Sequence, residues 1–143
     1  MAGVRRAARR LDFPLVMRAE QQRCALPPSA PTVEAVILIN VRFKPLPEYV
    51  ENFREVVSDF TEASRKEDGC LFFEWFRNTD NPNEYILVEG FKDDAAEAHV
   101  NSDHFQKATE LFPTVLTETP QIINTLIEGK TEWDRMAEFQ VEK

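Results

Sequence analysis

The order of its periodic segments limits most strongly how this chain can fold. Two strand-like segments are separated only by the polar stretch RNTDNPN, which is typical of a hairpin turn. The strand segments span 33–43, 70–76, 84–91 and 121–129, and the amphipathic helical segments span 46–67 and 92–112. The resulting order β-α-β-β-α-β predicts an α+β fold, a ferredoxin-like antiparallel sheet with both helices on one face.

Two details of the helical segments bear on the site. Gly69 follows the first helical segment, and we predict that it caps that helix at its C-terminal end. Ser102 and Asp103 lie within the second segment, and we expect them to divide it into two pieces.

The two ends of the chain differ in character. Residues 1–31 carry six arginines against two acidic residues and end in LPPSAP, so we expect a loosely ordered extension before a domain over 32–143. At the other end, Trp133, Met136 and Phe139 recur every three residues. A segment this apolar is expected to pack against the body of the protein or against a partner copy.

Composition excludes several classes of function. The net charge of −8 argues against a nucleic-acid partner, and no apolar run approaches the roughly 18 residues that span a membrane. Four glycines cannot build the usual dinucleotide or nucleotide phosphate loops. Cys24 and Cys70 lie too far apart in the sequence to suggest a disulfide framework, which favours a cytoplasmic protein.

The alternation of side chains along each strand sorts them onto two faces of the predicted sheet. The face expected under the helices comprises Ile37, Ile39, Val41, Leu71, Phe73, Ile86, Val88, Ile123 and Ile127. The mixed face is expected to comprise Val36, Leu38, Asn40, Phe72, Glu74, Phe76, Tyr85, Leu87, Glu89, Phe91, Ile122, Asn124 and Leu126. Monomers rarely expose so large an aromatic patch, so we expect a second copy of the chain to cover it in a homodimer.

The mixed face also predicts a small-molecule pocket, because a few polar groups lie there among aromatic rings. The polar residues are Asn40, Glu74, Glu89 and Asn124, and the aromatic residues are Phe72, Phe76, Tyr85 and Phe91. An alternative is that the two glutamates lie at the rim and pair with Arg42 or Arg77.

Residues 33–129 resemble a known family. The matching stretches are VILINVRFKP, EDGCLFFEWFRNTDNPNEYILVEGFKDDAAEAHVNSDHF and PQIINTLIEG. They are similar to the antibiotic biosynthesis monooxygenase (ABM) domain. The resemblance implies a dimeric α+β barrel. It also implies one of several activities: quinone-forming oxygenation without metal or flavin, processing of a phosphorylated sugar signal, or haem degradation.

The haem-degrading branch of that family can be compared residue by residue. It resembles this chain in Asn40 on the first strand, but Phe91 and Thr109 stand where its tryptophan and iron-binding histidine are expected. The resemblance therefore does not extend to haem cleavage.

His99 and His104 are the only histidines of the chain. Five residues on an unbroken helix turn by roughly 140°, so the two rings would point apart, and we expect no metal site. Both could be ordinary structural residues. Alternatively, His99 is the catalytic base, Asn40 or a protonated glutamate such as Glu74 holds the oxyanion, and His104 helps to bind substrate.

The sequence thus predicts a cofactor-independent monooxygenase that oxidises a polycyclic phenol or quinol with O₂. One alternative is an isomerase or lyase acting on a phosphorylated sugar, for which Arg42 and Arg77 are the obvious phosphate ligands. Another is a binding module without catalytic activity.

Overall fold

The computed structural model describes residues 34–143, so the prediction for residues 1–31 lies outside the described residues. The strands are β1 Ala35–Phe43, β2 Cys70–Arg77, β3 Tyr85–Lys92 and β4 Gln121–Glu128. The helices are the 3₁₀ helix η2 Pro47–Tyr49, α2 Phe53–Val56, α3 Ser58–Arg65, α4 Ala96–Val100 and α5 Asp103–Val115. None of the helices within residues 34–143 is long and apolar enough to cross a bilayer.

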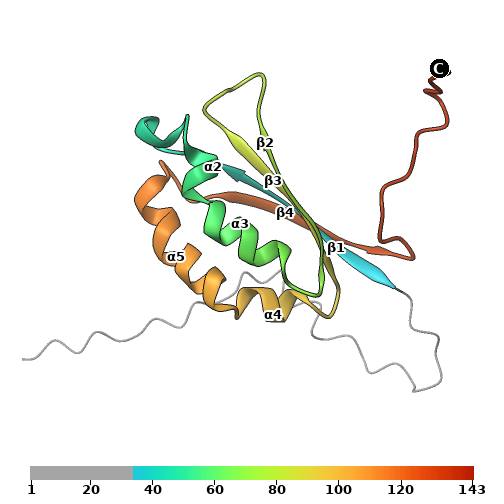
Figure 1. Cartoon of the computed structure of the whole chain (residues 1–143), viewed down its shortest axis with the longest axis horizontal. Coiled ribbons are helices and arrows are strands. Elements are labelled where there is room, and N and C mark those ends of the chain that lie inside the picture. Colours follow the sequence, from blue (N-terminus) through green and yellow to red (C-terminus); the bar gives the residue numbers. More distant parts are fainter. Residues whose placement is uncertain (1–33) are drawn as a thin grey trace, which may run out of the picture. The chain divides into compact units, whose positions relative to one another are not determined.

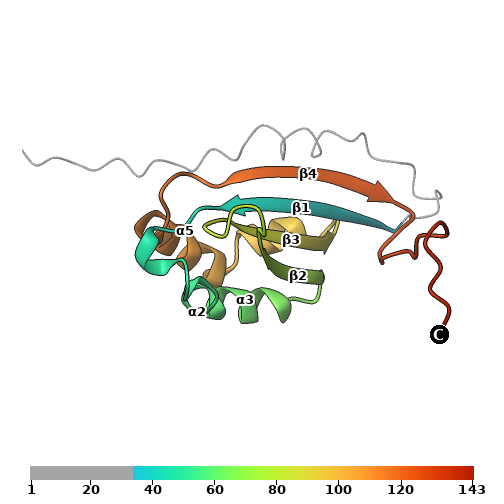
Figure 2. The same ribbon diagram turned by 90° about the horizontal axis from the view of Figure 1, so that it is seen from above.

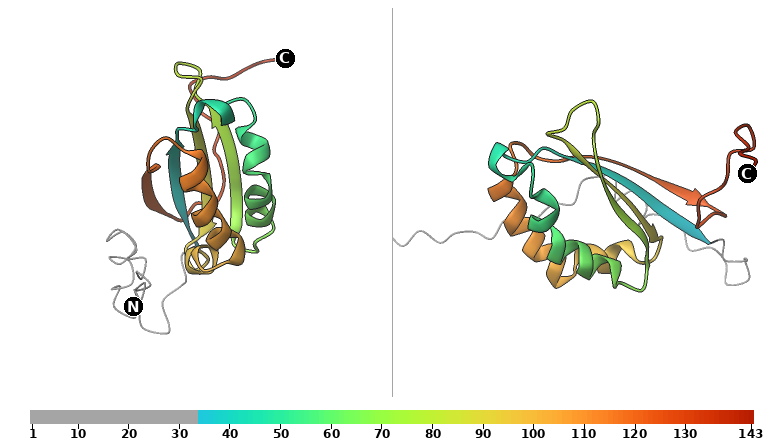
Figure 3. Two further views of the ribbon diagram at one scale, coloured as in Figure 1. Left: turned by 90° about the vertical axis from the view of Figure 1, so that its left-hand side faces the viewer. Right: turned by 45° about the horizontal axis from the view of Figure 1, so that its top comes forward.

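The four strands form one open antiparallel sheet in the order β2-β3-β1-β4. Helices α3 and α5 lie side by side across one face of this sheet and leave the other face uncovered by helices (Figures 1 and 2). Figure 3 shows the same two layers from the side. The α+β, ferredoxin-like prediction is confirmed.

The predicted faces are correct for β1 but wrong for β3 and β4. Residues directly opposite each other in an antiparallel pair share a face, and Ile39 lies opposite Glu89 and Asn124. The helix-covered face therefore carries Tyr85, Leu87, Glu89, Phe91, Ile122, Asn124 and Leu126. The open face carries Ile86, Val88, Ile123 and Ile127 instead.

The physical reason is that alternation within one strand does not give the register between strands. Both alternating sets of β3 are largely apolar, so hydrophobicity could not decide between them. In β2, an irregularity between Cys70 and Phe72 places Leu71 at a bulge. Phe73 lies under the helices, as predicted, with 2% of its surface exposed.

The helical segments are more divided than the sequence suggested. The predicted helix over 46–67 is three short helices, whereas the predicted break in the second helix is confirmed at Asn101 and Ser102. Gly69 is not a left-handed cap, because among the described residues only Gly129 has a positive φ. A Cβ at Gly69 would lie 2.0 Å from Ala95 Cβ, so glycine allows the start of α4 to pack closely there.

Candidate functional site

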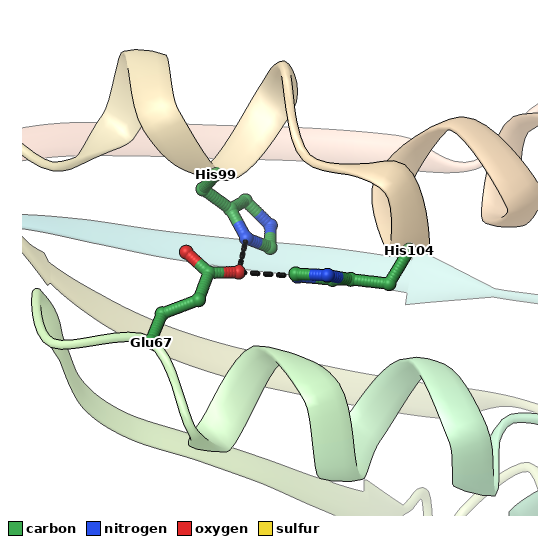
Figure 4. A group of neighbouring side chains, drawn as sticks. All are labelled: Glu67, His99 and His104. Carbon is green, nitrogen blue, oxygen red and sulfur yellow. Dashed lines mark hydrogen bonds and ion pairs between the residues drawn. The ribbon is translucent and has the colours of Figure 1, made fainter.

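Both histidines point at one carboxylate (Figure 4). Glu67 Oε1 lies 2.7 Å from His99 Nδ1 and 2.5 Å from His104 Nε2. The three side chains come from the turn after α3, from α4 and from the first turn of α5. We call Glu67, His99 and His104 the Glu–His cluster.

The break between α4 and α5 is what brings the two rings together. Ser102 begins α5 as its N-cap, and its Oγ accepts a hydrogen bond from the Phe105 amide at 3.2 Å. The same hydroxyl donates to the His99 carbonyl oxygen at 2.6 Å, which ends α4. The chain therefore turns between His99 and His104, and the prediction that their rings point apart is wrong.

His99 lies deep in the layer between helices and sheet, with 4% of its surface exposed. Its ring packs against Phe91 at 4.4 Å between centroids and meets the edge of Phe105 at 5.2 Å. Burial lowers the pKa of His99 below its ordinary value and outweighs the opposing effect of Glu67. The imidazole is therefore neutral at neutral pH.

Glu89, on β3, is a further buried polar residue on the helix-covered face of the sheet. Burial, with a smaller contribution from the charge of Glu67, raises the pKa of Glu89 to about 8, so its carboxyl group is protonated at pH 7. The thiol of Cys70 also stays protonated, because burial raises its pKa to about 11. A neutral imidazole and a neutral carboxylic acid thus lie in the same interior, on the helix-covered face of the sheet.

The remaining predicted catalytic and aromatic residues form a separate group on the open face. Asn40, Phe72, Glu74 and Phe76 point away from the helices, since they alternate with the buried Ile39, Val41 and Phe73 along their strands. A shallow hollow of about 300 Å³ lies there, lined in part by Asn40, Arg42 and Ile123. The sheet separates this group from His99, so the two cannot contact the same small molecule within one chain.

Two other residues predicted to line the pocket lie on the helix-covered face of the sheet instead. The Tyr85 hydroxyl donates to the Val50 carbonyl oxygen at 2.7 Å, which ties β3 to the helical layer. Asn124 is half-buried on β4 opposite Ile39, and therefore lies on the helix side of the sheet.

The alternative in which Arg42 or Arg77 pairs with Glu74 or Glu89 is not supported. Arg42 Nε lies 3.3 Å from Glu84 Oε1. Arg77 lies 2.6 Å from Glu51 and donates to the Pro82 carbonyl oxygen. Both arginines are therefore engaged by groups other than the two predicted glutamates.

Sequence reasoning missed Glu67, the residue that organises the cluster. It lies 32 residues before His99, and no spacing rule links the two positions. One available signal was the family-like pattern, which begins at EDG and so includes Glu67 together with both histidines.

Fold and site together define a small α+β protein with a carboxylate–imidazole cluster between its helices and an open sheet. The family model described as antibiotic biosynthesis monooxygenase matches residues 36–111, more than half of the chain. The chain belongs to the antibiotic biosynthesis monooxygenase family, as its resemblance predicted.

Individual relatives are distant. The uncharacterized protein sll1783 of Synechocystis sp. is 26% identical over 88 residues, which cover 61% of this chain and 58% of that protein. This chain therefore matches less than two thirds of that relative's length.

Two solved structures show the same fold. A conserved protein from Methanosarcina mazei Go1 superposes with a TM-score of 0.58 at 23% identity, covering 66% of this chain and 93% of that one. A protein from Caulobacter crescentus CB15 that carries the family's designation superposes with a TM-score of 0.59 at 22% identity, covering 64% and 89%. At this identity, these similarities establish the fold alone.

Proposed function

We propose that the protein is a cofactor-independent monooxygenase that oxidises a polycyclic phenol or quinol with O₂, and that His99 is its base. The observation that supports this most is the contact between Glu67 and His99 Nδ1. A carboxylate at Nδ1 holds the ring proton there and leaves the lone pair of Nε2 free to accept a proton. In the described part of the chain, Nε2 of His99 has no hydrogen-bond partner.

The proposed reaction balances without a cofactor. His99 accepts a proton from the substrate, and the resulting carbanion passes one electron to O₂. The radical pair then combines to a peroxide, which loses water to give the quinone. A methylene group and O₂ thus become a carbonyl group and H₂O. Protonated Glu89 replaces Asn40 as our proposed oxyanion partner, because it lies on the same face of the sheet as His99.

Access to the cluster is proposed to come from a surface hollow of about 450 Å³. Its lining residues are Glu67, Asp68, Gly69, Lys92, Asp94, Ala95, Ala98 and Ser102. Glu67 belongs both to the hollow and to the Glu–His cluster, so a ligand in the hollow would lie beside the residue whose carboxylate contacts both histidines.

A homodimer formed through the open face is part of the proposal. This face carries the half-exposed Phe76 and the largely exposed Ile123, at 51% and 73% exposure. Exposure of such large apolar side chains to water is unfavourable. In a two-fold dimer the same apolar face of a second copy would cover them. A cytoplasmic location is also proposed, on the ground of the cysteine usage of the sequence.

Oxygen uptake with an anthrone-type substrate tests the proposed activity. The full chain should consume O₂ and form quinone in equal amounts, above the rate of uncatalysed autoxidation. His99→Ala should lower turnover by roughly 10²–10⁴-fold, the usual contribution of a general base. Lys107→Ala, on the exposed side of α5, is the matched control. Equal turnover in His99→Ala and the parent would remove His99 from the mechanism.

The phosphorylated-sugar alternative is less well supported. The two arginines that the sequence offered as phosphate ligands both contact carboxylates, Arg42 with Glu84 and Arg77 with Glu51. A bound phosphate would have to displace these ion pairs. If the chain neither consumed O₂ nor turned over any quinol, a binding module without catalysis would become the better description.

A further inference from the structure

The Glu–His cluster brings together more metal-binding atoms than a single catalytic base requires. The three possible ligand atoms, one from each residue, lie within 4.8 Å of one another. Each is supplied by a different segment, and Figure 4 shows both rings directed at the same Glu67 carboxylate oxygen. We propose that Glu67, His99 and His104 form a binding site for a divalent metal ion of the Zn²⁺ type, with one coordination position left open.

The donor set fits this class of ion. Two imidazole nitrogens and one carboxylate oxygen form a His₂Glu ligand set, which binds Zn²⁺ and leaves a fourth position for water or substrate. Oxygen-only ions such as Ca²⁺ and Mg²⁺ prefer carboxylates and carbonyls to imidazole. Two histidines with one carboxylate therefore favour Zn²⁺ over the alkaline-earth ions.

Burial and packing hold the ligands close to a binding geometry. The side chains of His99, His104 and Glu67 are 5%, 22% and 17% exposed. Phe91 and Phe105 pack against the His99 ring, so it has little freedom to turn away. Ligand atoms about 2.0–2.2 Å from a tetrahedral Zn²⁺ lie roughly 3.3–3.6 Å apart. The contacts of Glu67 with His99 and His104, at 2.7 and 2.5 Å, would therefore open by about 1 Å or less. The two ring nitrogens, which lie within 4.8 Å of each other, would close by at most about 1.5 Å.

The charge around the cluster suits the approach of a cation. The hollow beside Glu67 is also lined by Asp68 and Asp94, with Lys92 as its one basic lining residue. These carboxylates attract divalent ions toward the hollow, where Glu67 is the first ligand reached. The hollow is also the side from which water could fill the open coordination position.

Metal binding would exclude the proposed role of His99 as a base. A metal ion on Nδ1 forces the remaining proton of the neutral ring onto Nε2. That nitrogen then donates instead of accepting. Zn²⁺ should accordingly inhibit the oxygen uptake proposed above, which makes the site a means of metal-dependent control.

Titration of the chelator-treated full chain with Co²⁺ tests the site without any substrate. We expect saturable binding of a single equivalent per chain, with the visible absorption of low-coordinate Co²⁺, and displacement by Zn²⁺. Glu67→Gln and His104→Gln should each weaken binding by more than about 100-fold, because loss of an outer-shell partner alone costs about 10–100-fold. This result is independent of whether the monooxygenase proposal succeeds.

Two controls separate the cluster from other donors. Asp94→Asn removes a charge from the hollow but no ligand, and Cys70→Ser removes the thiol nearby; each should change the affinity by no more than a few-fold. Should the ligand variants not fold, ¹⁵N NMR of the parent decides, since Zn²⁺ must shift Nδ1 of His99 and Nε2 of His104. Unsaturable Co²⁺ binding, unchanged ring nitrogens, or equal affinity in folded Glu67→Gln would overturn the proposal.

Discussion

At the scale of single residues, the Glu67 carboxylate interacts with several titratable groups in the interior. Glu67 Oε1 contacts both imidazoles. Burial raises the pKa values of Glu89 and Cys70, and the charge of Glu67 adds a smaller contribution to both. A negative charge on a buried carboxyl group or thiol is disfavoured by desolvation, and a nearby carboxylate adds repulsion to that cost. Burial, with a smaller contribution from the charge of Glu67, thus raises the pKa of Glu89 and keeps it protonated, while the Glu67 carboxylate also contacts the His99 ring.

The protonation of Glu89 predicts how stability depends on pH. In the folded chain Glu89 keeps its proton up to a pKa of about 8, whereas an unfolded glutamate ionises near pH 4.3. Between these values the folded state binds more protons, so stability falls as the pH rises. Glu89→Gln removes this effect and should stabilise the chain at pH 7 by on the order of 3 kcal/mol, at about 1.36 kcal/mol per pKa unit.

Urea unfolding at pH 4.5 and pH 7.5 measures this difference. The stabilisation by Glu89→Gln should be present at the higher pH and nearly absent at the lower one. Glu74→Gln, on the exposed face of the same sheet, is the control and should change stability by less than about 0.5 kcal/mol at both. A parent whose stability is constant over this range would contradict the prediction.

At the scale of elements, the sequence predicted the strands and the helix break at Ser102 better than it predicted which segments pack together, and it missed the division of the first helical segment into three. Each strand has a recognisable pattern of its own, and Ser102 is a residue type that begins helices. The pairing of Glu89 with Ile39 decides on which face of the sheet Glu89 lies. The Glu–His cluster forms because the turn that carries Glu67 packs against α4. Contacts between distant segments are set by register and packing, which a local pattern does not contain.

The break between α4 and α5 is itself testable. Ser102→Ala removes the acceptor for the Phe105 amide and the donor to the His99 carbonyl oxygen, and should destabilise the chain by about 1 kcal/mol. Ser102→Thr keeps a hydroxyl at that position and should retain most of the stability. Denaturant midpoints of the two variants measure the effect. If both fell equally, side-chain volume rather than capping would explain the loss.

A closer packing constraint lies within the sheet, at Gly90. A Cβ there would lie 2.3 Å from the Phe72 ring, which covers the glycine from the opposite strand. Gly90→Ala should therefore displace the Phe72 ring and destabilise the chain by about 1–3 kcal/mol, the usual cost of overpacking. In the double variant Gly90→Ala with Phe72→Leu, the leucine side chain is smaller than the phenylalanine ring and leaves room for the alanine Cβ. This variant should therefore recover part of the lost stability. Thermal melts of the single and double variants compare the two.

At the scale of the whole molecule, the C-terminal segment packs against the open face of the sheet. The ring of Trp133 lies 5.8 Å from that of Phe72, so the segment after β4 returns to the open face of its own chain. A hollow of about 200 Å³ lies between them, lined in part by Val36 and Ile127. Met136 and Phe139 extend further and are 63% and 73% exposed.

We therefore predict a dimer in which the segment after Gly129 packs at the interface. Light scattering of the parent at micromolar concentration should give twice the mass of the 16.5 kDa chain. Phe76→Glu places a charge on the apolar open face, near the end of edge strand β2, and should weaken the dimer, whereas Phe76→Leu should retain it. Truncation after Gly129 should weaken dimerisation and lower the melting temperature, because it removes the ring of Trp133 from Phe72. A stable parent monomer, or a truncated chain that dimerises and melts like the parent, would show that neither the open face nor this segment serves association.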